Sequence, residues 1–258
     1  AKLLETLNHD KIPNIRNLDN DYMNLSYDPN NRYSIPYFFG TVGILYDKEK
    51  YPNETFDSWD DLYHSQFKND ILLVDGAREI IGMGLNKLGY SLNDKNPTHI
   101  HQAEKDLHNL APQVRGIVGD EITMMLQQNE GHVAVVWSGV AAPLVQENTR
   151  YNYVIPKEGS NLWFDNMVIP KTAQNKEGAY KFMNFLLDAQ NSAQNTEWVG
   201  YATPNKAARS KLPKKVRNDY RFYPSKQEQQ RLEVYKDLGQ ASLSDYNESF
   251  LNFKMSLK

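Results

Sequence analysis

An aromatic residue and an acid lie two positions apart near the middle of the chain. Trp163 and Asp165 belong to Asn161-Leu-Trp-Phe-Asp165, in a segment that we expect to be extended, so both side chains should share one face. The face of an indole ring attracts a cation and packs against methylene groups, and a carboxylate accepts a charge-assisted hydrogen bond. This pairing suits an organic ammonium. The alternative is an exposed acid beside a Trp in the core.

Two more candidates lie where predicted strands end. Trp137 closes an apolar run and precedes Ser138-Gly139, which places its ring at the carboxyl end of a strand, where α/β proteins bind ligands; core packing is the equal alternative. Glu79 lies one turn into a helix for which Asp75 is the expected N-cap. Glu79 could bind a ligand or could only stabilise the positive end of the helix.

Signatures of catalysis and of metal binding are missing from the sequence. It contains no His-Glu-x-x-His, no phosphate-binding glycine loop with lysine and no Gly-x-Ser-x-Gly. Gly82-Met-Gly84 lies inside a predicted helix and indicates close packing. His99 and His101 should point to different faces of a helix, which argues against a metal site. We therefore expect no enzymatic activity, no metal and no cofactor.

Composition excludes several classes of protein. The 258 residues include 40% hydrophobic and 24% charged side chains, which is typical of a folded globular protein. The net charge of −3 argues against nucleic acid as a partner. The chain has no cysteine, and we find no uncharged stretch long enough to span a bilayer. Because it begins with Ala1 and no signal sequence precedes it, we expect a processed or truncated chain.

Short apolar runs alternate with helical patterns, which is typical of an α/β fold. Ser58-Trp-Asp-Asp61 is the pattern of a capping box that opens a helix. Residues 33–40 and 151–170 are extended, rich in aromatics and bounded by Pro or Gly, as crossings between two lobes would be. The pattern predicts strands at 71–74, 114–118 and 132–137, and helices at 80–85 with a stop at Gly89, at 98–110, 120–128 and 176–194, and at 227–258 with a break near Gly239.

Four segments together resemble a known family. They are residues 28–37 (Asp-Pro-Asn-Asn-Arg-Tyr-Ser-Ile-Pro-Tyr), Asp75-Gly-Ala-Arg-Glu79, Asn161-Leu-Trp-Phe-Asp165 and Gly200-Tyr-Ala-Thr-Pro-Asn205. In order and spacing they resemble the spermidine/putrescine-binding proteins of polyamine ABC transporters, and the Gram-positive branch among them. The resemblance implies a two-lobed receptor of the periplasmic-binding-protein type II fold. Such a receptor works outside the cytoplasm, in the periplasm or tethered to the outer face of the membrane, and delivers its ligand to permease subunits.

The resemblance also implies lobe boundaries. Residues 1–39 and 165–209 would form the first lobe, and residues 40–164 and 210–258 the second. Strands that open the first lobe in the family precede the stretch that matches Ala1 to Lys11, so we expect the first lobe to be incomplete in this chain.

Site residues follow from the resemblance. Asp165 would bind one terminal ammonium of a polyamine and Glu79 an ammonium toward the other end, while Trp137, Trp163 and Tyr201 flank the methylenes. Asp75 and Tyr235 complete the set of candidate ligand-binding residues. The sequence departs from some relatives at two positions, because Gly76 replaces an acid and Tyr235 replaces an amide. The preference between spermidine and putrescine therefore stays open.

Two other functions remain possible from the residues alone. Paired carboxylates and Trp platforms also describe the clefts of carbohydrate-active enzymes, which need one acid to be neutral at neutral pH. Binding of an amine needs both acids ionised. A related binding protein for sugars or anions is the third interpretation.

Overall fold

The chain folds into two compact units in a computed structural model that describes residues 3–257. The first unit comprises Ala1–Gly40 and Trp163–Tyr223, and the second comprises Thr41–Leu162 and Pro224–Lys258. Two strands, β1 (Ser34–Asp47) and β6 (Ser160–Val168), run from one unit into the other. β1 contains nearly all of residues 33–40, and β6 lies in the second half of residues 151–170, the two segments that the sequence suggested as crossings.

Residues 210–223 group with the first unit, whereas the sequence assigns them to the second lobe. Contacts of Tyr223 explain the grouping. Its ring packs under the guanidinium of Arg209 at 4.1 Å, and its hydroxyl accepts a hydrogen bond of 3.2 Å from the backbone N–H of Thr203. The lobe boundaries themselves stay a prediction.

A mixed sheet forms the centre of the second unit. Its order is β3 (Val114–Val118), β2 (Ile71–Val74), β4 (Val133–Trp137) and β1, and β5 (Tyr151–Val154) also pairs with β1. β2 is parallel to both β3 and β4, while β1 is antiparallel to β4 and β5. Every residue of β2 is buried, as expected for a parallel strand covered on both faces. The predicted strands and their α/β alternation are confirmed.

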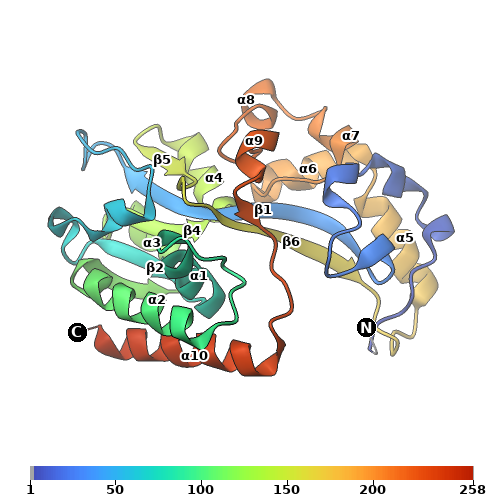
Figure 1. Cartoon of the computed structure of the whole chain (residues 1–258). Helices are drawn as coiled ribbons and strands as arrows, with labels where there is room; N and C mark the ends of the chain where they lie inside the picture. The colour runs from blue at the N-terminus through green and yellow to red at the C-terminus, as the bar shows by residue number, and fades with distance from the viewer. Residues whose placement is uncertain (1–2, 258) are drawn as a thin grey trace. The chain divides into compact units, whose positions relative to one another are not determined.

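Three helices of the second unit pack together: α1 (Ala77–Lys87), α2 (Pro97–Leu110) and α10 (Gly239–Ser256) (Figure 1). A Cβ atom at Gly84 would lie 3.3 Å from the Cβ of Ala103 on α2, and one at Gly82 would lie 3.2 Å from the Cβ of Leu92. The two glycines therefore allow close approach to α1, as the sequence predicts. The remaining elements of this unit are α3 (Ile122–Gln127), α4 (Ser138–Glu147), α9 (Lys226–Gln229) and β7 (Leu232–Glu233).

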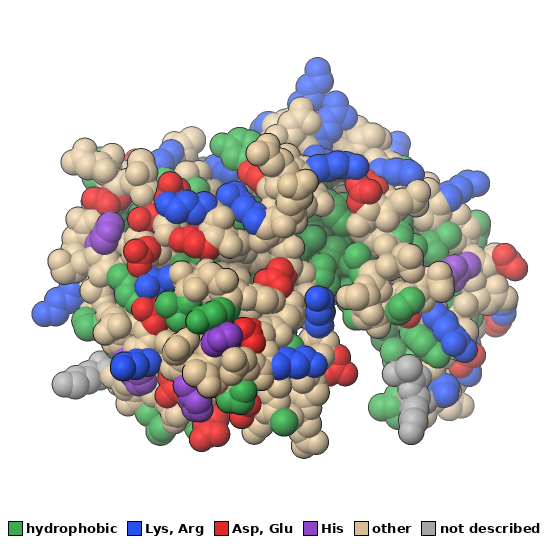
Figure 2. Space-filling view, in the orientation of Figure 1, with side chains coloured by type: hydrophobic (Ala, Val, Ile, Leu, Met, Phe, Trp, Pro, Cys, Tyr) green, Lys and Arg blue, Asp and Glu red, His purple; other side chains and the backbone are tan. Residues whose placement is uncertain are grey.

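The first unit consists mainly of helices around a small core. Its helices are α5 (Lys176–Leu186), α6 (Ala189–Val199), α7 (Lys206–Arg209) and α8 (Lys214–Arg217). Lys and Arg side chains gather over α7 and α8 in Figure 2, where they face solvent. The core consists of Leu7, Ile12, Leu18, Ile35, Ile169, Tyr180, Met183 and Leu187.

Short 3₁₀ segments connect these elements. The predicted capping box at Ser58 is present. The Ser58 side chain accepts a hydrogen bond from the backbone of Asp61, and the Asp61 side chain accepts one from the backbone N–H of Ser58. It opens a 3₁₀ segment and not an α-helix. The 3₁₀ segments are His9–Lys11, Pro13–Asn17, Asn20–Tyr22, Pro29–Asn31, Trp59–Tyr63, Ser65–Phe67 and Ala111–Gln113.

Two helix predictions are wrong. Residues 176–194 form two helices, because the Asp188 side chain accepts hydrogen bonds from the backbone N–H groups of Gln190 and Asn191 and so begins α6. Residues 227–238 hold only the end of α9, strand β7 and a loop. Pairing of Leu232 with Ser160 in the parallel β6–β7 ladder competes with a helix there. Among residues 3–257, no helix combines the length and apolarity needed to cross a membrane.

Candidate ligand-binding site

Trp163 and Tyr201 form an aromatic group in the first unit. Their ring centroids are 5.5 Å apart at 71°, and the ring of Phe38 meets Tyr201 edge-on at 5.7 Å. Tyr201 is held in place on both sides, because Gly200 ends α6 in the left-handed conformation (φ 82°) and the carbonyl of Ala202 accepts a 2.9 Å hydrogen bond from Phe39. Edge-to-face packing fixes the planes of these rings.

Asp165 lies two residues after Trp163 on β6, and the alternation of a strand places both side chains on one face. The side chain is exposed, and the structure gives it no hydrogen bond or ion pair among the described residues. Partial burial nevertheless raises the pKa of its carboxyl. A neighbouring cation would offset that loss of solvation, so Asp165 has the properties expected of an acid that binds an external ammonium.

Trp137 and Glu79 follow two adjacent parallel strands of the second unit. β2 and β4 pair in register, with Leu73 opposite Val135, so both strands end at the same edge of the sheet. Trp137 is the last residue of β4 and the N-cap residue of α4. Glu79 lies in the first turn of α1, which follows β2. The predicted position of Trp137 at a strand's carboxyl end is confirmed.

Glu79 is joined to Tyr235, which the sequence places 156 positions away. The Tyr235 hydroxyl donates a hydrogen bond of 3.1 Å to Oε1 of Glu79. Burial, and then the negative charge of Glu79, raise the pKa of Tyr235, so the phenol keeps the proton that it donates. The other carboxylate oxygen, Oε2, lies over Gly76, where a Cβ atom would come within 2.2 Å of it.

Asp75 does not cap α1. The N-cap residue is Gly76, and no side chain accepts a hydrogen bond there. Both carboxylate oxygens of Asp75 instead accept hydrogen bonds of 2.9 Å from Nζ of Lys254 on α10. The prediction of a cap is wrong because a lysine 179 positions along the chain competes for the carboxylate.

Arg78 and Asn93 are two residues near Glu79 that the sequence did not single out. The guanidinium of Arg78 lies over the ring of Tyr235 at 4.3 Å and donates to Oδ1 of Asn93 at 2.9 Å. Asn93 also accepts a hydrogen bond from the backbone of Lys236 and donates to the carbonyl of Val234. These bonds attach the segment that carries Tyr235 to α1. No local pattern in the sequence marks contacts of this range.

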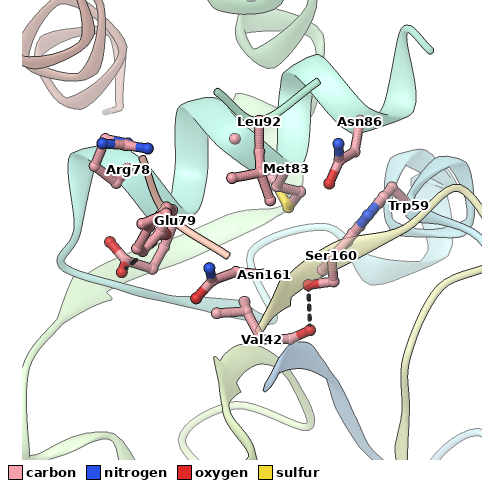
Figure 3. A pocket seen from close by; sticks show the side chains of 11 residues that line it. Val42, Trp59, Arg78, Glu79, Met83, Asn86, Leu92, Ser160 and Asn161 are labelled. Atoms are coloured by element: carbon pink, nitrogen blue, oxygen red, sulfur yellow. Dashed lines mark hydrogen bonds between the residues drawn. The ribbon is translucent and has the colours of Figure 1, made fainter. Parts of the chain in front are cut away.

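A small cavity of about 10 Å³ lies beside Glu79 and Tyr235 (Figure 3). This volume suits one water-sized group. Asn161 lines it, and the Nδ2 of Asn161 donates to the carbonyl of Glu233 at 3.1 Å, while its buried Oδ1 has no hydrogen-bond partner. Ser160 lines the same cavity and donates to the carbonyl of Val42 at 2.6 Å, drawn as a dashed line between these two residues in Figure 3. Its place in the motif Asn161-Leu-Trp-Phe-Asp165 is the sequence feature that could have identified Asn161 as a residue of this cavity.

The histidines have other partners. The ring of His99 stacks on Tyr90 at 3.9 Å, and its Nδ1 lies 2.7 Å from a carboxylate oxygen of Asp94. His101 lies 3.4 Å from Glu104. Within residues 3–257, no group of three or more His, Asp or Glu side chains could hold a metal ion.

Comparison with known proteins places the chain in a family. The model of a family described as bacterial extracellular solute-binding protein matches residues 1–222, most of the chain. This chain is a bacterial extracellular solute-binding protein. Its two units and mixed α/β architecture are those of the periplasmic-binding-protein type II fold, as the sequence predicts.

Named relatives of this solute-binding protein cover nearly the whole chain. It is 55% identical to a structure titled as a putative spermidine/putrescine ABC transporter from Listeria monocytogenes, with a TM-score of 0.94 over 98% of this chain and 79% of that one. A spermidine/putrescine ABC transporter substrate-binding protein from Streptococcus pneumoniae is 45% identical, with a TM-score of 0.90 over 100% and 79% of the two chains. The spermidine/putrescine-binding periplasmic protein of Escherichia coli K12 is 38% identical over 98% of this chain and 72% of its own length.

Proposed function

We propose that this protein binds a polyamine, spermidine or putrescine, and delivers it to an ABC permease. The observation that carries the proposal is the arrangement of Trp163, Tyr201 and Asp165. Two fixed aromatic rings at 5.5 Å offer faces to methylenes and ammonium groups. Asp165 lies on the strand of Trp163, and within residues 3–257 the structure gives its carboxylate no ion pair. This combination suits a flexible organic cation better than it suits a sugar or an anion.

The second unit supplies a further acid and a further indole. Glu79 offers a carboxylate and Trp137 an indole at the edge where β2 and β4 end. A diamine or a triamine carries an ammonium group at each end. We propose Asp165 as the acid that binds one ammonium and Glu79 as an acid that binds another, as the resemblance to polyamine-binding proteins implies.

The names of the relatives support the choice of ligand. Proteins that are 38% to 55% identical to this chain are named for spermidine and putrescine. Those names also associate the relatives with ABC transporters, from which we infer permease subunits as the partner. We infer an extracytoplasmic location, tethered to the outer face of the membrane, because the two structural relatives with the highest identity given above come from Listeria and Streptococcus.

Titration calorimetry tests the proposed function. Putrescine, spermidine and lysine are titrated into the protein at neutral pH and moderate ionic strength. We expect saturable binding of at least one polyamine, and much weaker binding of lysine, whose α-carboxylate would meet the carboxylate of Asp165 or Glu79. If neither polyamine binds, the proposed function is wrong.

A further inference from the structure

The guanidinium group of Arg78 contacts two tyrosine rings of the second unit. Its Cζ atom lies 4.3 Å from the ring centroid of Tyr235 and 5.4 Å from that of Tyr246. A guanidinium over the face of an aromatic ring is attracted by the quadrupole of the ring, and the attraction increases where water is excluded. Tyr235 lies in the loop after β7 and Tyr246 on α10, so Arg78 joins two separate segments of the chain.

The surroundings of Tyr246 fix its ring. Its side chain is fully buried on α10, and its hydroxyl lies 3.0 Å from the carbonyl oxygen of Leu92 and 2.9 Å from that of Asp94. Asn93, the residue between them, is also buried and accepts a hydrogen bond of 2.9 Å from Nη2 of Arg78. A buried ring and a buried amide thus fix the position of the guanidinium.

Tyr235 depends on Arg78 more than Tyr246 does. It lies in the loop between β7 and α10, outside any regular helix or strand that would orient its side chain. The guanidinium of Arg78 lies over its ring, and Nη1 of Arg78 also donates to the carbonyl of the next residue, Lys236, at 3.4 Å. The same guanidinium therefore holds the ring of Tyr235 and the backbone beside it.

The hydroxyl of Tyr235 in turn orients Glu79. It donates a hydrogen bond of 3.1 Å to Oε1 of the carboxylate, which uses one oxygen and holds the other, Oε2, in a defined direction. A side chain that is ordered before a ligand arrives loses less conformational entropy on binding than a free side chain does. We expect this ordering to outweigh the use of one acceptor, so the hydroxyl should favour binding.

We propose that Arg78 is a positioning residue for ligand binding, because it holds the ring of Tyr235 where the hydroxyl orients the carboxylate of Glu79 for an ammonium group. The inference rests on the proposed function and adds a residue to the site. Arg78 acts on the ligand only through Tyr235 and Glu79. Arg78, Tyr235 and Glu79 all belong to the second unit, as do Asn93 and Tyr246.

The charge of Arg78 separates this proposal from simple electrostatics. A cation fixed near an acid that binds an ammonium group repels the ligand, so removal of that charge alone would strengthen binding. Loss of a contact that orients Tyr235 would weaken binding. The two explanations therefore predict changes of opposite sign when Arg78 is replaced by an uncharged residue.

Arg78→Met measures that sign. Putrescine is titrated by calorimetry, and we expect its affinity to fall at least threefold. Arg115→Met is the matched control, because Arg115 lies on β3 of the same unit with a side chain that is 38% exposed, and its removal changes the net charge equally without weakening binding. Unchanged or tighter binding by Arg78→Met would overturn the inference. Absence of binding by the unmodified protein would instead contradict the proposed function.

A double variant tests the route through Tyr235. Tyr235→Phe keeps the ring and removes only the hydroxyl, so we expect it to weaken putrescine binding by the same factor as Arg78→Met. The protein with both substitutions should bind no more weakly than either single variant, because the same orientation is lost once. Losses that multiply would show that Arg78 acts by another route. A much larger loss in Tyr235→Phe would show that the hydroxyl binds the ligand itself, and tighter binding would show that it only competes with the ligand; each result would overturn the inference.

Arg78→Lys provides the rescue. Lysine keeps a cation that can lie over the ring of Tyr235, but it lacks the planar fork that reaches Asn93 and the carbonyl of Lys236 together. We expect it to recover most of the affinity that Arg78→Met loses. A loss as large as that of Arg78→Met would assign the effect to the hydrogen bonds and overturn the role of the ring contact. If Arg78→Met does not fold, Arg78→Gln, which can still donate to Asn93, replaces it in every comparison.

Discussion

Asp165 in the first unit and Glu79 in the second are acids of the same formal charge, but their surroundings and hydrogen-bond partners differ. Asp165 lies beside two fixed aromatic rings and has no protein partner among the described residues, and partial burial raises its pKa. Glu79 lies in the first turn of a helix and accepts a hydrogen bond from Tyr235. The structure gives the first acid no hydrogen bond among the described residues, whereas the second already accepts one from the protein.

This difference suggests that the two acids contribute unequally to ligand binding. An uncompensated acid gains most from an external cation, because the ligand replaces lost solvation. An acid that already accepts a hydrogen bond from the protein gains less from the ligand. We therefore expect Asp165 to contribute more to polyamine affinity than Glu79 does.

The largest expected effect follows from Asp165→Asn. Removing one partner of a desolvated charge pair costs about 2 to 5 kcal/mol, and no other cation-binding group lies next to Asp165 on β6. Polyamine affinity should fall at least tenfold by calorimetry. A change of less than threefold would show that Asp165 does not anchor an ammonium.

The pH dependence of polyamine binding should also report the ionisation of Asp165. The ligand binds the ionised carboxylate, and the pKa of Asp165 in the free protein is raised by burial. Binding is therefore complete above that raised pKa and weakens as the pH falls through it, by about tenfold for each pH unit. The Asp165→Asn variant should lose this component of the pH dependence, and an identical profile in both proteins would assign the titration to another group.

Substitution of Trp163 comes next in size. Each ring contributes apolar burial and a cation–π attraction of about 0.5 to 2 kcal/mol. We expect Trp163→Ala to weaken binding about tenfold and Trp163→Phe to weaken it less, because Phe retains a ring that can face Tyr201. Equal losses in the two variants would mean that Trp163 only fills space.

The smallest loss of affinity should follow from Glu79→Gln. The amide keeps an oxygen that can accept the hydrogen bond from Tyr235. We expect putrescine affinity to fall about threefold, clearly less than in Asp165→Asn. A loss as large as that of Asp165→Asn would contradict the contrast between the two acids.

Local sequence patterns predicted much of the fold and part of the candidate site. Ile71–Val74 and Val133–Trp137 are apolar runs of strand length, so their burial and the position of Trp137 followed from sequence. The alternation of a strand placed Trp163 and Asp165 on one face. Gly82 and Gly84 inside a helix correctly indicated close packing. Each of these inferences depends on residues within one element.

The features that the sequence did not predict depend mostly on contacts between residues far apart in the chain. Asp75 has the right type and spacing for a cap, yet Lys254 engages it from α10. Residues 176–194 have a continuous helical pattern, but the side chain of Asp188 ends one helix and begins the next. The bond from Tyr235 to Glu79 depends on how β7 and its following loop are attached to α1, and no local pattern encodes that attachment.

The most direct test of the account is a crystal structure of the protein with putrescine. Our account predicts one ammonium within hydrogen-bonding distance of the Asp165 carboxylate and the other within reach of Glu79 Oε2. The methylenes should lie against Trp163 and Tyr201, and the Asp75–Lys254 and Glu79–Tyr235 contacts should be intact. A ligand that contacts neither acid, or only one of them with its second ammonium in solvent, would contradict the central claim.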